Sequence, residues 1–180
     1  MARTEIRFAG FGGQGVVMAG ILLGRAAVVS GDRYALQTQS YGAAARGGAV
    51  RSDVILDDRQ IVYPRISALD VLVVLSNQAA ERYLGDLKTG GLLVIDEDLV
   101  SLSTNGADAC DFRLSKLNPS RMAGDLFGRS IYANLIIVGY VVRRTELLRT
   151  ESVEEAIRAT VPPATLENNL QAFHAGLELE

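Results

Sequence analysis

The sequence contains little of the side-chain chemistry on which most catalytic and metal sites depend. Its 180 residues include one cysteine, Cys110, one histidine, His174, and no tryptophan. A single cysteine excludes an internal disulfide and cannot hold an iron–sulfur cluster, which uses about four thiolates. His174 lies beside an apolar stripe of helical spacing without a second metal ligand nearby. We therefore expect a structural or surface role for it, and neither a triad nor histidine acid–base chemistry.

The sequence also lacks an excess of either charge and a long apolar run. The 18 basic and 21 acidic residues give a net charge of −3 and are interspersed, so neither a nucleic acid nor a membrane surface is favoured as a partner. No apolar run is long enough to span a bilayer, and the start MARTEIRFAG lacks the features of a secretory signal, so we expect a cytoplasmic protein. With 48% hydrophobic residues, the chain is expected to fold as one domain over residues 1–180.

What the chain does have is an alternation of strand and helix patterns. Strands are predicted at 6–9, 34–38, 71–75 and 92–95, with an edge strand near 111–114. Helices are predicted at 14–29, 78–85 and 130–144. A further helix is expected to begin at the capping box 152–155, and a last one to follow Pro162-Pro163. Residues 49–56 and 60–63, which flank Asp57-Asp58, are predicted to form an antiparallel hairpin, and Thr89-Gly90-Gly91 a turn. The pattern predicts an α/β fold of three layers: a mostly parallel sheet with a Rossmann-like first βα unit and an antiparallel hairpin insertion.

The most conspicuous stretch is FAGFGGQGVVMAG, between the first strand and the first helix. Gly10, Gly12 and Gly15 satisfy the pattern G-x-G-x-x-G, and Gly13 and Gln14 lie inside it. Glycines let the chain turn sharply and let a ligand approach the backbone, while the N–H groups at the helix start favour negative charge. Gln14 is expected to offer an amide hydrogen bond. The stretch therefore predicts a phosphate or polar-ligand site, unless the glycines serve only close helix–sheet packing.

Two common nucleotide sites fit this loop poorly. A dinucleotide site needs an acidic residue at the end of the second strand, yet that strand ends in Gln37-Thr38-Gln39, and Asp32 lies before it. A P-loop needs Gly-Lys-Ser/Thr where this chain has Gln14-Gly15-Val16.

A second cluster follows the second strand and comprises Tyr41, Arg46, Gly47, Gly48 and Arg51. Its connector is expected to leave the sheet at the same edge as the glycine loop, so that both line one crevice. Arg46, between small residues, has room to present its planar guanidinium to a phosphate or carboxylate. The alternative is a solvated arginine in a flexible loop.

Three further polar residues are expected to be structural. Asn77 and Asp96 follow parallel strands and are expected to cap the following turns. Asn134 lies in an apolar helix and is expected to make a buried hydrogen bond or a subunit contact.

Taken together, these motifs resemble the gamma subunit of 2-oxoacid:ferredoxin oxidoreductases. The similarity runs from about Ile6 to Tyr140 through IRFAGFGGQGVVMAG, QSYGAAARGGAVRSDV, DVLVVLSNQAAERY, GGLLVIDEDLV and YANLIIVGY, in the family's order. One departure is Ala43-Ala44, where relatives commonly have Pro-Glu. That difference removes a carboxylate from the second cluster.

The resemblance implies a role within a larger enzyme. Such enzymes oxidatively decarboxylate a 2-oxoacid, transfer the acyl group to coenzyme A and pass electrons to ferredoxin. This chain has no Gly-Asp-Gly motif and too few cysteines for a cluster, so thiamine diphosphate, magnesium and the iron–sulfur clusters are expected in alpha, beta and ferredoxin-like delta partners. The implied substrate is 2-oxoglutarate, with pyruvate, branched-chain and indolepyruvate versions left open.

The resemblance also gives the two clusters a hypothesis. Coenzyme A is the expected shared ligand, and this chain is expected to hold no cofactor alone. The candidate binding residues are Gly10, Gly12, Gly13, Gln14, Gly15, Tyr41, Arg46, Gly47, Gly48 and Arg51. Two alternatives remain: a stand-alone dinucleotide-binding domain, and a purely structural subunit. Native co-purification distinguishes them, because only the enzyme complex brings thiamine and iron–sulfur absorbance.

Overall fold

The computed structural model describes residues 3–31, 33–42, 48–102 and 111–180. Its strands are β1 (Thr4–Phe11), β2 (Tyr34–Tyr41), β3 (Ala49–Asp57), β4 (Leu69–Val74), β5 (Leu87–Asp96) and β6 (Arg113–Leu117). Its α-helices are α1 (Val16–Val29), α2 (Asn77–Tyr83), α4 (Pro119–Phe127), α5 (Ala133–Thr145), α6 (Thr150–Arg158) and α7 (Leu166–Leu177). Short 3-10 turns η1 (Leu84–Asp86), η2 (Ser130–Tyr132) and η3 (Pro163–Thr165) precede β5, α5 and α7.

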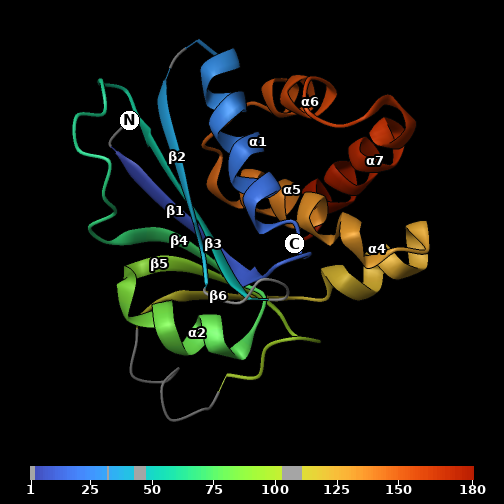
Figure 1. The fold of residues 1–180 in the computed structure, drawn as a ribbon, viewed down its shortest axis with the longest axis horizontal. Helices are drawn as coiled ribbons and strands as arrows, with labels where there is room; N and C mark the ends of the chain where they lie inside the picture. Colours follow the sequence, from blue (N-terminus) through green and yellow to red (C-terminus); the bar gives the residue numbers. More distant parts are fainter. Residues whose placement is uncertain (1–2, 32, 43–47, 103–110) are drawn as a thin grey trace.

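The strands form one sheet in the order β2-β3-β1-β4-β5-β6 (Figure 1). β1, β4, β5 and β6 are parallel neighbours, whereas β3 pairs antiparallel with both β1 and β2. β2 therefore runs in the same direction as β1, and its carboxyl end reaches the same edge of the sheet. The predicted mostly parallel sheet is confirmed, and so is the shared edge.

The hairpin prediction was wrong about the partner strand. The partner of β3 is β2, which pairs with it along the whole length of β2, from Tyr34 opposite Asp57 to Tyr41 opposite Val50. Residues 60–63 form no strand. The Rossmann-like prediction holds only for β1 and α1, because the antiparallel β3 occupies the place beside β1 that a parallel β2 takes in a dinucleotide fold.

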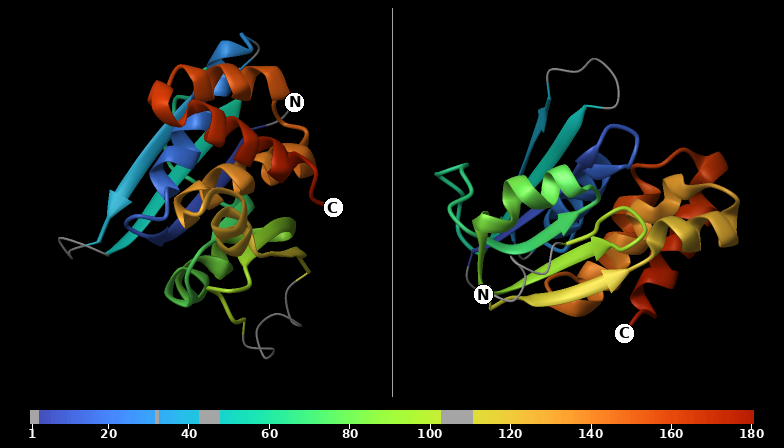
Figure 2. Two further views of the ribbon diagram at one scale, coloured as in Figure 1. Left: turned by 90° about the vertical axis from the view of Figure 1, so that its right-hand side faces the viewer. Right: turned by 90° about the horizontal axis from the view of Figure 1, so that it is seen from below.

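Helices cover both faces of the sheet and make three layers. α1 and the C-terminal helices lie on one face and α2 on the other, as the turned views make plain (Figure 2). The larger core lies under α1, α5, α6 and α7. α5 and α7 cross closely at Gly139 and Gly176, where a Cβ atom on either glycine would overlap backbone of the other helix.

Several element boundaries differ from the sequence expectations. α4 was not predicted, although Pro119 at its start and Gly128 after its end, in the left-handed conformation, are ordinary boundary signals. α6 begins at Thr150, so Ser152 is a buried residue inside the helix and not its cap. β5 runs through the predicted turn at residues 89–91. Inside this strand Gly90 takes a left-handed φ of 73°, and its N–H donates to the Asp111 carbonyl.

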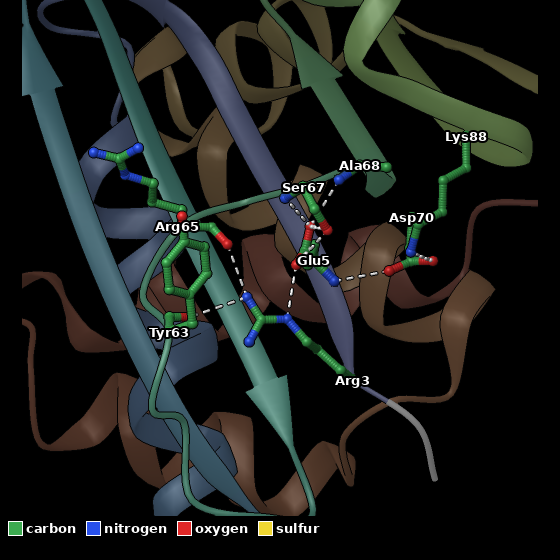
Figure 3. Close-up of polar contacts among 8 residues, drawn as sticks. All are labelled: Arg3, Glu5, Tyr63, Arg65, Ser67, Ala68, Asp70 and Lys88. Carbon is green, nitrogen blue, oxygen red and sulfur yellow. Dashed lines mark hydrogen bonds and ion pairs between the residues drawn. The ribbon is translucent and has the colours of Figure 1, made fainter.

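The segment after β3 is fixed by Glu5, at the amino end of β1 (Figure 3). This carboxylate is about 1% exposed and accepts hydrogen bonds from the backbone N–H groups of Ser67 at 2.8 Å and Ala68 at 3.0 Å. Arg3 Nε donates to it at 2.7 Å. Burial alone would raise the pKa of Glu5, but these bonds outweigh burial and lower the pKa below its ordinary 4.5.

Further hydrogen bonds of Arg3, Glu5 and Asp70 hold the same segment at the amino ends of the strands. Arg3 also donates to the carbonyls of Tyr63, at 3.1 Å, and Arg65, at 2.8 Å. The backbone N–H of Glu5 donates to Asp70 at 2.8 Å, and Lys88 pairs with the same carboxylate at 2.7 Å (Figure 3). An extended segment without sheet partners is thereby held against the amino ends of β1 and β4.

Glu5→Gln is expected to lower the free energy of unfolding at pH 7 by about 1–3 kcal/mol, because buried donors lose their charged acceptor. The lowered pKa sets the pH window. The contribution of Glu5 is complete above pH 4.5 and is lost as the pH falls through the lower folded value, so the two proteins should converge in acid. Denaturant titrations at pH 3–7 measure this, with the exposed Glu81→Gln as the control. A difference that persists unchanged at pH 3 contradicts the assignment.

A cavity at the start of the first helix

A cavity of about 510 Å³ lies at the carboxyl edge of the sheet, beside the glycine loop. One wall consists of loop and α1 residues: Gly12, Gly13, Gly15, Val16, Val17 and Met18. Tyr41 and Val50, from the β2–β3 pair, close one side. The remaining lining comes from Arg129, Ile131, Tyr132 and Asn134 around the start of α5. Around the start of α7, Val161, Pro162, Thr165 and Asn169 complete it.

The loop is held in shape by its own glutamine. Gln14 Oε1 accepts the backbone N–H of Phe11 at 2.6 Å, and Gln14 Nε2 donates to the Leu75 carbonyl at the end of β4, at 3.0 Å. The Gly12 N–H donates to the Gly48 carbonyl at 3.0 Å, which joins the loop to the start of β3. Both ends of the Gln14 amide are therefore engaged within the protein, and one N–H of Nε2 beyond the bond to Leu75 is left for the hydrogen bond expected to a ligand.

The start of α1 keeps its backbone donors available. Gly15 stands at the N-cap position with a φ of 72°, a conformation that glycine adopts without strain, and offers no side chain to cap the helix. Within the described part of the chain, the N–H groups of Val16, Val17 and Met18 have no hydrogen-bond partner. All three residues line the cavity. These are the unsatisfied donors that helix N-termini present to anions and carbonyl oxygens.

Two further helices begin at the same cavity. Tyr132 and Asn134 flank the first residue of α5, and Thr165 is the N-cap residue of α7. Each helix carries partial positive charge at its amino end, so three dipoles favour negative charge here. Among the described lining residues only Arg129 has a formal charge. The walls are otherwise largely apolar, which suits a ligand with a charged part and an apolar part.

The described residues include no group of three or more histidine, cysteine, aspartate or glutamate side chains placed to bind a metal ion. His174 is half exposed, with Nε2 2.8 Å from Oε1 of Glu154, so it joins α7 to α6. The hydrogen bond with His174 is the main reason why the pKa of Glu154 is lowered. Of the helices described, none combines the length and apolar character required to cross a membrane.

Comparison with known proteins decides the family. The sequence profile described as pyruvate ferredoxin/flavodoxin oxidoreductase matches residues 5–179. The chain belongs to this family. It is 45% identical over 179 residues to the 2-oxoglutarate synthase subunit KorC of Methanothermobacter thermautotrophicus, which covers 98% of this chain and 95% of the relative. The resemblance that the motifs indicated is confirmed.

Solved structures of family members give the same result. The gamma subunit of a keto/oxoacid ferredoxin oxidoreductase from Geobacter sulfurreducens superposes with a TM-score of 0.86 at 37% identity, over 99% of this chain and 96% of that one. A 2-oxoglutarate:ferredoxin oxidoreductase from Magnetococcus marinus, solved with 2-oxoglutarate, coenzyme A and succinyl-CoA bound, has a TM-score of 0.85 at 18% identity. It covers 98% of this chain and 31% of that chain, and at this identity it supports the fold alone.

Within this family member, the structure brings some of the predicted site residues together. Gly12, Gly13, Gly15 and Tyr41 line the cavity. Gly10 and Gly48 do not line it, but both contact residues of the glycine loop. Gly10 lies in β1, where a Cβ atom would overlap the Gln14 side chain, and Gly48 holds Gly12. Arg46 and Gly47 lie outside the described residues.

Arg51 is not part of the cavity. It alternates with Val50 and Ser52, which face α1, and therefore points to the face covered by α2. There its guanidinium lies 3.8 Å from Asp53 and 5.8 Å from the centre of the Tyr83 ring. Arg7 pairs with the same Asp53 at 2.6 Å. The strand register, which the sequence alone did not fix, separates Arg51 from the glycine loop.

The residues expected to be structural have structural contacts. Asp96 accepts the N–H groups of Asp98, at 3.1 Å, and Ser120, at 3.2 Å, and so caps a turn and the start of α4. Asn77 accepts the Ser101 N–H at 2.8 Å, while the cap of α2 is Ser76. Asn134 is buried and donates to the Gly15 carbonyl at 3.4 Å, as expected of a buried amide, but it also lines the cavity.

Sequence reasoning missed the far wall of the cavity. Arg129, Ile131, Val161 and Thr165 are more than a hundred residues from the glycine loop and belong to no motif. The available signals were weak: an arginine after the helix-ending Gly128, and a proline pair before α7. These mark boundaries of helices, and helix boundaries alone do not reveal which helix ends meet.

Gly15→Ala is expected to destabilise the chain more than Gly13→Ala, by about 1–3 kcal/mol. Both glycines have positive φ and so share a backbone cost, but only a Cβ at position 15 would overlap the Asn134 side chain. Adding Asn134→Ala to Gly15→Ala should recover part of the loss. Chemical denaturation of these three variants and of Asn134→Ala alone measures this coupling, and equal costs at the two glycines would show that the Asn134 contact is absent.

Proposed function

We propose that this chain is the gamma-type subunit of a multisubunit 2-oxoglutarate:ferredoxin oxidoreductase and that its cavity binds part of coenzyme A. The observation that carries the ligand assignment is that the N–H groups of Val16, Val17 and Met18 have no partner among the described residues. These three residues line a largely apolar cavity whose described lining has one charged side chain, Arg129. Coenzyme A combines phosphates with a long uncharged arm. The backbone N–H donors and Arg129 suit the phosphates, and the valine-rich walls suit the uncharged arm.

The substrate class is supported by the relatives. The proteins of 34–45% identity that cover 98% of this chain are 2-oxoglutarate synthase subunits, whereas a common gamma subunit of pyruvate and ketoisovalerate oxidoreductases from Thermococcus litoralis is 31% identical. The reaction proposed is oxidative decarboxylation of 2-oxoglutarate to its acyl-CoA, with electrons passed to ferredoxin. Residues 1–180 act in it as one domain, inside the cell.

The chemical steps belong to partner subunits. With one cysteine this chain cannot supply the thiolates of an iron–sulfur cluster, and its described residues offer no acidic or histidine cluster for magnesium. Thiamine diphosphate, magnesium and the clusters are therefore proposed in alpha, beta and delta-type partners. This chain binds and orients the acyl acceptor through Gly12, Gly13, Gly15, Tyr41 and Arg129, with Arg46 and Gly47 as further candidates from the sequence.

The stand-alone dinucleotide domain is the weaker alternative. Such a domain places the second strand beside the first, with an acidic residue at its end to bind the ribose. Here β3 lies between them, and β2 ends in Ser40 and Tyr41. The indolepyruvate version of the family has no support among the relatives cited above.

Arg129→Gln in the assembled enzyme is expected to weaken coenzyme A binding about tenfold or more, because a charge-assisted hydrogen bond to phosphate is lost. Isothermal titration of the complex with coenzyme A measures it. Arg143→Gln is the matched control: Arg143 is an exposed arginine in the last turn of α5, whose first turn faces the cavity. Unchanged affinity in Arg129→Gln removes Arg129 from the site.

A further inference from the structure

Asn134 has a buried hydrogen-bond acceptor that the protein does not satisfy. The residue is about 6% exposed, and its Oδ1 has no partner in the described structure. Its Nδ2 donates to the Gly15 carbonyl at 3.4 Å, which is long for an N–H···O bond. A buried acceptor without a partner is costly, and native proteins retain one where a ligand or water completes it.

The position of this amide links it to the ligand cavity. Asn134 lines the cavity and packs directly against Gly15, the residue before the free N–H groups of α1. The terminal torsion of asparagine is broad, and the one long bond to Gly15 holds it weakly. Rotation about this torsion changes the direction of Oδ1, which is covered in the free chain, so a molecule in the cavity that Asn134 lines can complete its hydrogen bonding.

The chemistry of the acceptor limits what lies beside it. A carbonyl oxygen needs an N–H or O–H donor, and ionised phosphate oxygens only accept. A phosphate at this point would leave Oδ1 unsatisfied and would place negative charge against it. The nearby apolar side chain of Ile131 also favours an uncharged group.

We propose that Asn134 is a specificity-determining residue of the cavity, and that its side-chain carbonyl accepts a hydrogen bond from an uncharged N–H group of the bound ligand. This inference rests on the proposed binding of coenzyme A. Coenzyme A has two sources of such a group, the amides of the pantetheine arm and the amino group of adenine. In either case the phosphates bind the N–H groups of α1 and Arg129, and the Asn134 carbonyl accepts from a different, uncharged group of the same ligand.

The test uses the assembled enzyme with Asn134→Leu, which keeps the branched shape and the number of non-hydrogen atoms but removes the acceptor, and with Asn134→Asp, which keeps an acceptor oxygen. Isothermal titration gives the affinity for coenzyme A, and competition against coenzyme A is measured for pantetheine, adenosine and inorganic diphosphate. Thermal unfolding of each variant shows whether it is folded.

Asn134→Leu is expected to weaken coenzyme A about tenfold. It should also weaken one neutral probe, pantetheine or adenosine, whichever supplies the N–H group, and Asn134→Asp should retain that probe. Competition by diphosphate should be the same in the wild type and in Asn134→Leu.

Two results overturn the inference. If Asn134→Leu leaves coenzyme A and both neutral probes unchanged while Arg129→Gln weakens coenzyme A, the cavity binds the coenzyme without Asn134. If Asn134→Leu weakens diphosphate instead, a phosphate lies at this position. When neither Asn134→Leu nor Arg129→Gln alters coenzyme A affinity, the proposed binding of coenzyme A in this cavity is wrong, which is a distinct outcome.

Discussion

The site depends on one bridging side chain, Gln14. Its carbonyl accepts the Phe11 N–H and its amide donates to the Leu75 carbonyl, so it ties the glycine loop to the ends of two neighbouring parallel strands. Because a side chain makes these bonds, the backbone donors at the start of α1 are not needed to hold the loop. They belong to residues that line the cavity, where three helix amino ends raise the local positive potential.

The sheet topology explains how remote parts of the chain reach this loop. Inserting β3 antiparallel beside β1 brings the start of β3 to the glycine loop, where the Gly48 carbonyl accepts the Gly12 N–H. The same pairing places Tyr41 opposite Val50 on the cavity face and sends Arg51 to the other face. On the far side, the close crossing of α5 and α7 at two glycines brings both helix starts to the same opening.

Local patterns were sufficient to predict the first βα unit, the parallel strands and the apolar α5, because each has a clear hydrophobic period and recognisable boundary residues. The glycine loop was recognised for the same reason, and three of its glycines line the cavity, while ligand binding there stays a prediction. The partner of β3 could not be predicted, since pairing with β2 or with residues 60–63 satisfies the same local pattern. The structural role of Gln14 could not be predicted either, because its second partner, Leu75, is 61 residues away. Arg129 and Asn134 belong to helix starts whose meeting point depends on tertiary packing.

Hydrogen–deuterium exchange of the assembled enzyme, with and without coenzyme A, tests the central claim most directly. The backbone N–H groups of Val16, Val17 and Met18 have no partner in the described structure and should exchange rapidly in the absence of the coenzyme. Saturating coenzyme A should slow their exchange, while the exposed α2 on the opposite face should be unaffected. Exchange at the start of α1 that is already slow, or that coenzyme A binding leaves unchanged, contradicts the account.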